Sequence, residues 1–319
     1  MKTLLMCLLL AAPAAGADKL TAPQLIDLAR HHPARLREAL VATLTADALA
    51  KGTAVLGRGE HFIWAVDATS RPTLLLDEAP GPPMRRIAGS DTWYATGTYA
   101  VRTSHAFAYT IAGKTFGGSK DVAAFGPDSY LKAGVPQGTL SDKLVHTSKA
   151  IYEGLRSNYW TYVPAQYTPS TPAALMVFQD GQGYVRPESE HDRGRIIDAL
   201  DNLIYEHKIP VMIAVFVQPG DITQSPDSAF AKEMVEKFKA SPAPPPGARP
   251  RGPQNMVRGT QYDTVTDRYA RFLRDELLAE VQSRYNIRKD SYSRGITGQS
   301  SGGIAAFNVA WQQPEQFSR

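Results

Sequence analysis

Cysteine is the scarcest residue in this chain of 319 residues, with a single copy at position 7. Cys7 lies in a segment that we expect to be removed, so the mature chain should carry no thiol. This absence excludes disulfide bonds, cysteine-ligated zinc and a cysteine nucleophile together. A chain without cysteine suits an oxidising compartment but does not require one.

The chain also lacks a large excess of charge of either sign. Lys and Arg number 35 and Asp and Glu 31, which gives a formal net charge of +4, and no five consecutive residues are all Lys or Arg. We therefore expect no nucleic-acid partner. The fractions of hydrophobic and charged residues, 43% and 21%, are those of a globular protein, and the length suggests two domains.

Long hydrophobic runs are missing, apart from twelve apolar residues between Leu4 and Ala15. Lys2 precedes this run, and the small residues Ala15-Gly16-Ala17 follow it. The layout predicts a secretory signal peptide at residues 1–17, because the run is too short to span a bilayer; a buried N-terminal helix is the alternative. We expect a periplasmic or secreted protein with no integral membrane segment after cleavage.

Two patterns follow the leader. Residues 18–50 have a helical pattern of apolar residues with a break at Pro33, and residues 51–118 change to a period of two with frequent turn residues. The segments with strand character are 53–56, 61–66, 72–76, 93–99 and 106–111. This spacing predicts an all-β, immunoglobulin-like sandwich.

Four aromatic residues of this β-rich region have two interpretations. They are Trp64, Trp93, Tyr94 and Tyr109. They would form either a platform on which sugars stack or part of the core. Core packing is favoured, because half the residues of any strand face inward.

The rest of the chain predicts an α/β domain. A connector rich in glycine and proline spans residues 119–150. From 151 to 319, strand-like segments (160–163, 173–178) alternate with a helical one (195–207), and the continuous apolar run 211–217 indicates a strand buried on both faces. An amphipathic helix is expected from Asp263 to Tyr285, after a proline-rich insertion at 241–253.

The strongest chemical signal is Gly298-Gln299-Ser300-Ser301-Gly302, between a short strand and a run of small residues. This is the Gly-x-Ser-x-Gly pattern of a nucleophile elbow in its strand–turn–helix setting. Glycines two residues either side of Ser300 avoid collisions in the tight turn. The N–H of Ser301, at the start of the next helix, is a candidate oxyanion-hole donor. An ordinary glycine-rich turn is the alternative.

Together with four other segments, this motif resembles the enterochelin-esterase-like branch of the esterase D and feruloyl esterase group of α/β-hydrolases. The segments are Trp160-Thr-Tyr-Val-Pro164, Val177-Phe-Gln-Asp-Gly181, Tyr262-Asp263 and Asn286-Ile-Arg-Lys-Asp290. The branch is also similar to acetyl-xylan esterases and mycolyl transferases. The resemblance covers residues from about Tyr152 to Arg319, and the preceding β-rich segment is similar to the immunoglobulin-like domain that often precedes such esterases.

The resemblance implies further site residues. The loop after Phe178 should supply the second oxyanion N–H, from Gly181 or Gln182. Asp180 is expected to anchor this loop rather than act as a base, and Arg258 to face the pocket, both as candidate substrate-binding residues. Gln261 stands where many relatives have an acidic residue.

The serine lacks a partner in the expected order. Triads of this fold run serine, acid, histidine along the chain, yet all seven histidines (31, 32, 61, 105, 146, 191 and 207) precede Ser300. We therefore expect the chain to be a C-terminally truncated fragment, itself poorly active, with the acid and the histidine beyond Arg319. Replacement of the missing base by His191 or His207 is disfavoured.

The sequence thus predicts an exported serine esterase that acts on a small-molecule or carbohydrate ester through an acyl-enzyme on Ser300, with no metal or organic cofactor. A feruloyl or acetyl-xylan type of esterase and an acyltransferase on the same scaffold are alternatives. A non-catalytic carbohydrate-binding module is a further alternative.

Overall fold

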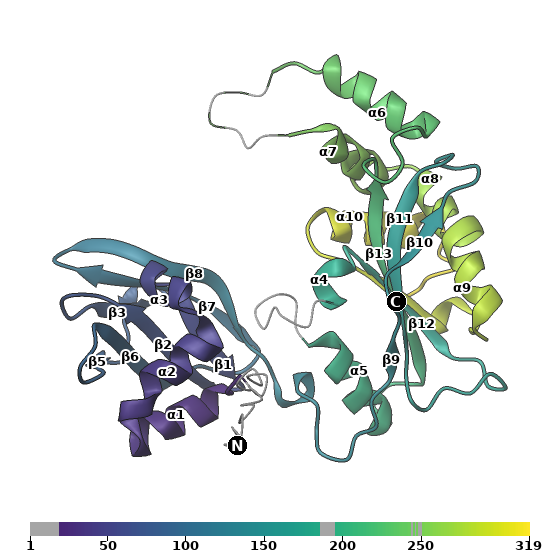
Figure 1. The fold of residues 1–319 in the computed structure, drawn as a ribbon. Coiled ribbons are helices and arrows are strands. Elements are labelled where there is room, and N and C mark those ends of the chain that lie inside the picture. Colours follow the sequence, from purple (N-terminus) through teal and green to yellow (C-terminus); the bar gives the residue numbers. More distant parts are fainter. Residues whose placement is uncertain (1–18, 186–194, 244, 246, 248–250) are drawn as a thin grey trace, which may run out of the picture. The chain divides into compact units, whose positions relative to one another are not determined.

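The computed structural model describes residues 19–185, 195–243, 245, 247 and 251–319. The chain divides between Pro127 and Asp128 into two compact units (Figure 1). The expected signal peptide at 1–17 and His191 lie outside the described residues. No helix within the described ranges combines the length and the apolar character needed to cross a membrane.

Three helices open the N-terminal unit. They are α1 (Ala22–His31), α2 (Pro33–Leu44) and α3 (Ala46–Lys51). Pro33 occupies the first position of α2, where its missing N–H costs no hydrogen bond, which explains the break predicted there. Leu25, Leu36 and Leu40 are fully buried, and they pack against one face of a sheet.

Two four-stranded antiparallel sheets complete this unit. One has the order β1-β2-β6-β5 and the other β4-β3-β7-β8. Their bounds are β1 (Ala54–Arg58), β2 (His61–Asp67), β3 (Thr73–Leu76), β4 (Ala79–Pro80), β5 (Arg85–Arg86), β6 (Thr92–Thr98), β7 (Thr103–Ile111) and β8 (Lys114–Ala124). The expected β-rich N-terminal region is confirmed.

Strand β2 shows how the layers are joined. Ile63 and Ala65 face the helices, whereas Phe62 and Trp64 face the second sheet, because successive side chains of a strand point to opposite faces. Trp64, Tyr94 and Tyr109 are buried, so the core interpretation of these aromatic residues is confirmed for all three.

Strand β8 was not expected at its full length. It runs from Lys114 to Ala124 and pairs with β7, so the connector predicted to begin at residue 119 starts inside it. Most of its side chains are exposed, and Gly117 and Gly118 have positive φ. A polar strand interrupted by glycines carries little of the apolar alternation from which strands are predicted.

The C-terminal unit contains a sheet with the strand order β10-β11-β13-β12-β14, and β9 pairs with β11. The bounds are β9 (Thr139–Leu140), β10 (Leu144–Thr147), β11 (Arg156–Val163), β12 (Ala174–Gln179), β13 (Met212–Asp221) and β14 (Arg294–Thr297). β12 is parallel to both β13 and β14, whereas β11 runs antiparallel to β13.

Helices cover both faces of this sheet, as predicted (Figure 1). On one face, α5 (Ile196–Tyr205) packs against Phe178 and Phe216. On the other, α8 (Arg268–Arg271), α9 (Leu278–Arg284) and α10 (Ser301–Gln312) share a core with Val177. The remaining helices are α4 (Gln182–Val185), α6 (Ala229–Lys239) and α7 (Pro253–Arg258), with short 3-10 turns at Pro127–Ser129 and Ser291–Ser293.

The helix predicted from Asp263 to Tyr285 begins later and is irregular. A π-helical segment, Gly259–Asp263, ends in extended backbone at Thr264, and α8 starts at Arg268. A second π-helical segment, Phe272–Leu277, links α8 to α9. Three of the four residues from Thr264 to Asp267 are β-branched, which disfavours helix there.

Candidate active site

Ser300 lies in the turn that joins β14 to α10. Its backbone has φ 52° and ψ −127°, a conformation that is strained for any residue other than glycine. It occupies the position before α10, yet its side chain makes no capping hydrogen bond to the helix. Serine at this position usually caps the helix through its hydroxyl. Ser300 does not, and the residue is exposed.

The two elbow glycines are required by contact. A Cβ atom at Gly298 would lie 2.3 Å from the carbonyl oxygen of Gly302, and one at Gly302 would lie 2.8 Å from Asp180 Oδ2. Contacts this short cannot be accommodated without a shift of the backbone or of the loop. The steric reason inferred from the sequence thus applies to Gly298 directly, whereas Gly302 is restricted by the neighbouring loop.

The backbone of the elbow directs N–H groups toward the serine. The carbonyl oxygen of Ser300 accepts hydrogen bonds from Gly303 N and Ile304 N, at 2.9 and 3.1 Å. Ser301 is the first helical residue of α10, and N–H groups at this position have no acceptor within a helix. The Ser301 N–H therefore has no acceptor within α10 and remains a candidate for the donor role expected of it.

The loop after β12 lies against the same elbow. Asp180 has φ 58°, and Gly181 follows it. A Cβ atom at Gly181 would lie 2.3 Å from the backbone of Phe216, and the Gly181 N–H donates to Val217 O at 2.9 Å. The glycine thus permits close approach to β13, and its N–H already has an acceptor. Gln182, the other expected donor, begins α4.

Asp180 and Arg258 contact each other. The guanidinium donates two parallel hydrogen bonds, from Nη1 to Oδ1 at 2.9 Å and from Nη2 to Oδ2 at 2.8 Å. It also stacks over the ring of Tyr262, with Cζ 4.9 Å from the ring centroid. The bidentate geometry fits the loop-anchoring role expected of Asp180.

Beneath the loop lies a buried polar network that the sequence analysis did not identify. Tyr269 donates to Gln179 Oε1 at 2.6 Å, and the Tyr262 hydroxyl accepts from Asp180 N at 3.4 Å. Burial raises the pKa of both tyrosines, so their hydroxyls stay protonated at neutral pH. Gln179 Cβ would be 3.0 Å from a Cβ at Gly298, so the network underlies the elbow itself.

Gln261, which stands where many relatives have an acidic residue, is buried and binds the end of β13. Its Oε1 accepts the Gly220 N–H at 2.7 Å, on β13. Gln254 also binds this strand end, donating to Gly220 O at 2.7 Å. No sequence motif indicated these roles, because glutamine recurs in many structural contexts.

No histidine is hydrogen-bonded to Ser300 in the part of the chain that the structure describes. His146, on β10, binds Glu280 Oε2 at 2.7 Å. Three strands separate β10 from β14, so at about 4.8 Å per strand the two sites are roughly 19 Å apart. His207 precedes β13, whereas Ser300 follows β14. Because β12 runs parallel to both strands, His207 lies at the N-terminal ends of the parallel strands and Ser300 at their C-terminal ends.

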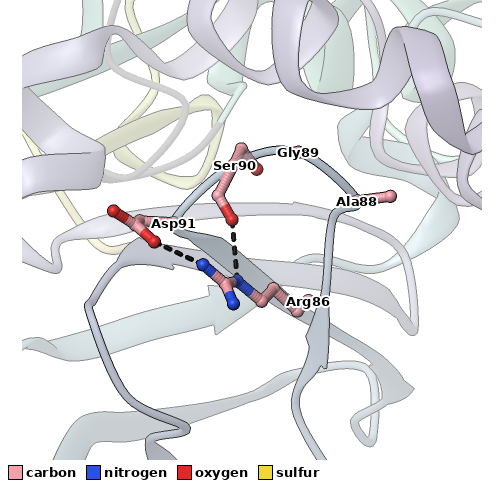
Figure 2. Close-up of a pocket in the computed structure, with 5 residues that line it drawn as sticks. All are labelled: Arg86, Ala88, Gly89, Ser90 and Asp91. Atoms are coloured by element: carbon pink, nitrogen blue, oxygen red, sulfur yellow. Dashed lines mark hydrogen bonds and ion pairs between the residues drawn. The ribbon is translucent and has the colours of Figure 1, made fainter.

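The structure gives weaker evidence for a functional site away from Ser300. A hollow of about 400 Å³ in the N-terminal unit is lined by Arg86 and residues 88–91 (Figure 2). The Arg86 guanidinium is already bound to Ser90 O and Asp91 Oδ1, at 2.8 and 2.6 Å. None of the predicted site residues lines this hollow. Within the described ranges, no group of three or more His, Cys, Asp or Glu residues is arranged to hold a metal ion.

A family model described as "Putative esterase" matches residues 154–319, just over half of the chain. No match was found among curated protein sequences.

Solved structures that match this chain include two bacterial enterobactin esterases and a fungal enzyme. The enterobactin esterase of Shigella flexneri, determined in the presence of enterobactin, has a TM-score of 0.47 and 13% identity, and the match covers 81% of this chain and 69% of that one. The ferric enterobactin esterase of Salmonella typhimurium has a TM-score of 0.45 and 13% identity, with the same coverage. A ferulic acid esterase from Anaeromyces mucronatus has a TM-score of 0.40 and 16% identity, covering 60% of this chain and 61% of the other.

Proposed function

This chain belongs to the putative esterase family, and on that premise we propose that it is an exported serine esterase that cleaves carboxylic esters through an acyl-enzyme on Ser300. The observation that supports this most directly is the exposed Ser300 hydroxyl. It is held at φ 52° before α10 and is not used as a helix cap.

The proposed reaction has two steps. Ser300 Oγ attacks the ester carbonyl, a general base takes the hydroxyl proton, and that proton leaves with the alcohol as the ester C–O bond breaks. Water then attacks the acyl-enzyme, which releases the carboxylic acid and restores the serine. Throughout, the Ser301 N–H at the start of α10 donates to the oxyanion.

The second oxyanion donor is proposed to come from the loop at 180–182. Because the Gly181 N–H binds Val217 O, its use as a donor would require that hydrogen bond to break; Gln182, which begins α4, is the other candidate. Asp180 and Arg258 are proposed to line the substrate side of the elbow, where Arg258 remains partly exposed.

We also propose a specific fold class for each of the two units and a cellular location for the protein. Two antiparallel sheets packed on Trp64 and Tyr109 support an immunoglobulin-like sandwich over residues 51–118. A sheet with parallel central strands and helices on both faces supports an α/β-hydrolase domain over 151–319, reached through the connector 119–150. The apolar run from Leu4 to Ala15 supports a signal peptide and a periplasmic or secreted location.

A fluorophosphonate probe tests the nucleophile. The wild-type full-length protein should be labelled within the tryptic fragment 295–319, at Ser300, and Ser300→Ala should abolish labelling. Ser301→Ala is the matched control: it keeps the backbone N–H, so labelling should persist. Absence of labelling in the wild type, or labelling that survives Ser300→Ala, would contradict the proposal.

The substrate class is tested separately. Release of acid is measured from p-nitrophenyl butyrate, methyl ferulate, acetylated xylan and a catecholate trilactone, each with and without an added alcohol. Preference for the trilactone fits an enterochelin-esterase-like enzyme, and preference for the second or third ester fits a carbohydrate esterase. Ester products formed with the alcohol in excess over free acid would instead identify an acyltransferase.

A further inference from the structure

The Asp180 carboxylate lies directly beside the first turn of α10. Its Oδ2 would be 2.8 Å from a Cβ atom at Gly302, the second residue of that helix, and its side chain is only 14% exposed. Ser301, the proposed oxyanion donor, is the preceding residue. Asp180 thus lies against the residue next to the proposed oxyanion donor, since consecutive Cα atoms are only about 3.8 Å apart.

The Asp180 carboxylate and the substrate oxyanion would compete for the partial positive charge at the N-terminus of α10. The N-terminus of a helix carries a partial positive charge that favours one nearby anion, and α10 has twelve residues. A bare carboxylate already in place would repel a second negative charge on the substrate oxygen. A protein that uses Ser301 as a donor therefore needs to neutralise Asp180.

Arg258 supplies the opposite charge with little freedom to move. It ends α7, binds both oxygens of Asp180, and lies over the buried ring of Tyr262. A bidentate pair of this kind fixes both the charge and its direction.

We propose that Arg258 is a positioning residue whose charge cancels that of Asp180, so that the N-terminus of α10 remains available to the anionic tetrahedral intermediate on Ser300. This inference rests on the proposed function of Ser300. It assigns to Arg258 an electrostatic task at the elbow that is separate from any contact with substrate.

Phenylboronic acid tests the proposal, because it forms a tetrahedral anion on a serine hydroxyl without turnover. Its Kd is measured for the wild type, Arg258→Gln, Asp180→Asn and the double variant, with Arg284→Gln on α9 as a distant control. Arg258→Gln should weaken binding about 10- to 100-fold, the effect of removing one compensating charge at roughly 7 Å in a medium of effective dielectric constant about 20. Asp180→Asn in that background should restore the Kd to near the wild-type value.

A conservative variant separates charge from shape. Arg258→Lys keeps the charge but loses the bidentate geometry, so it should recover most of the wild-type Kd, whereas a merely structural role of the guanidinium gives Arg258→Lys and Arg258→Gln equal Kd values. Wild-type binding by Arg258→Gln, or equal weakness of the single and double variants at unchanged melting temperature, overturns the inference. If the wild type binds no better than Ser300→Ala, the proposed function itself fails, and this inference with it.

Discussion

At the scale of single residues, backbone space decides what the elbow tolerates. The Gly-x-Ser-x-Gly pattern was readable because glycine and serine recur at fixed spacing for a steric reason, and Gly298 meets the backbone of Gly302 as that reason requires. The contacts of Gly302, Gln179 and Arg258 could not be predicted from the sequence, because the partner of each residue is distant along the chain and only folding brings the two together.

Replacing Gly298 with alanine should therefore destabilise the C-terminal unit. The added Cβ overlaps the carbonyl oxygen of Gly302, and we expect a loss of about 1–3 kcal/mol in the free energy of unfolding. Urea denaturation followed by circular dichroism measures it. Gly259→Ala is the control, because its nearest neighbour would be 3.8 Å away and helical backbone favours alanine; equal losses for both would contradict the steric account.

At the scale of elements, polar contacts between segments fix their ends. Glu276 accepts the N–H groups of Lys149, Ala150 and Ile151, at 3.1, 3.0 and 2.9 Å, and so holds the chain between β10 and β11 against the helical layer. Burial alone would raise the pKa of Glu276, but the hydrogen bonds from Ser148 and these amides outweigh it and lower the pKa. The amphipathic pattern predicted this helix, but not the π-helical segments or the turn that Glu276 caps.

Glu276→Gln should lower the free energy of unfolding by about 1–3 kcal/mol, because an amide group replaces an acceptor that is bound by three donors. Since the folded-state pKa lies below the unfolded one, the carboxylate's contribution is present above pH 4.5 and is lost as the pH falls through the folded-state pKa. The two proteins should converge in acid. Glu233→Gln on the exposed face of α6 is the control and should change little; a difference that persists in acid would contradict this account.

At the scale of the whole molecule, two units with separate cores share one chain. The N-terminal core encloses His105, which is 2% exposed, packs against Phe62, Trp64 and Tyr99, and has no hydrogen-bond partner for either ring nitrogen among the described residues. Burial lowers the pKa of His105, and the attraction of Asp77 opposes this only in part. Protonation must therefore weaken the folded state of this unit.

We expect the N-terminal unit to lose stability as the pH falls below about 6.5, because the unfolded histidine then binds a proton that the folded one excludes. The slope should approach about 1.4 kcal/mol per pH unit. Replacing Trp160 and Trp311 with phenylalanine leaves Trp64 and Trp93 as fluorescent reporters of this unit. In that background His105→Phe should flatten the acid dependence, whereas His61→Gln should not; an unchanged slope in His105→Phe would refute the assignment.

The sequence by itself determined the order of the parts and the position of the serine. Periodicity follows from which side chains a strand or helix must bury, and the elbow motif follows from the space a tight turn leaves, so both are local. Tertiary structure alone decided that Arg258 binds Asp180 beside the elbow, that Tyr269 binds Gln179, that Gly181 gives its N–H to β13, and that β8 is a strand. The contacts of Asp180 and Gly181 depend on pairings between segments tens of residues apart, which no local pattern encodes. β8 pairs with its neighbour β7, but its polar, glycine-interrupted sequence lacks the alternation from which strands are predicted.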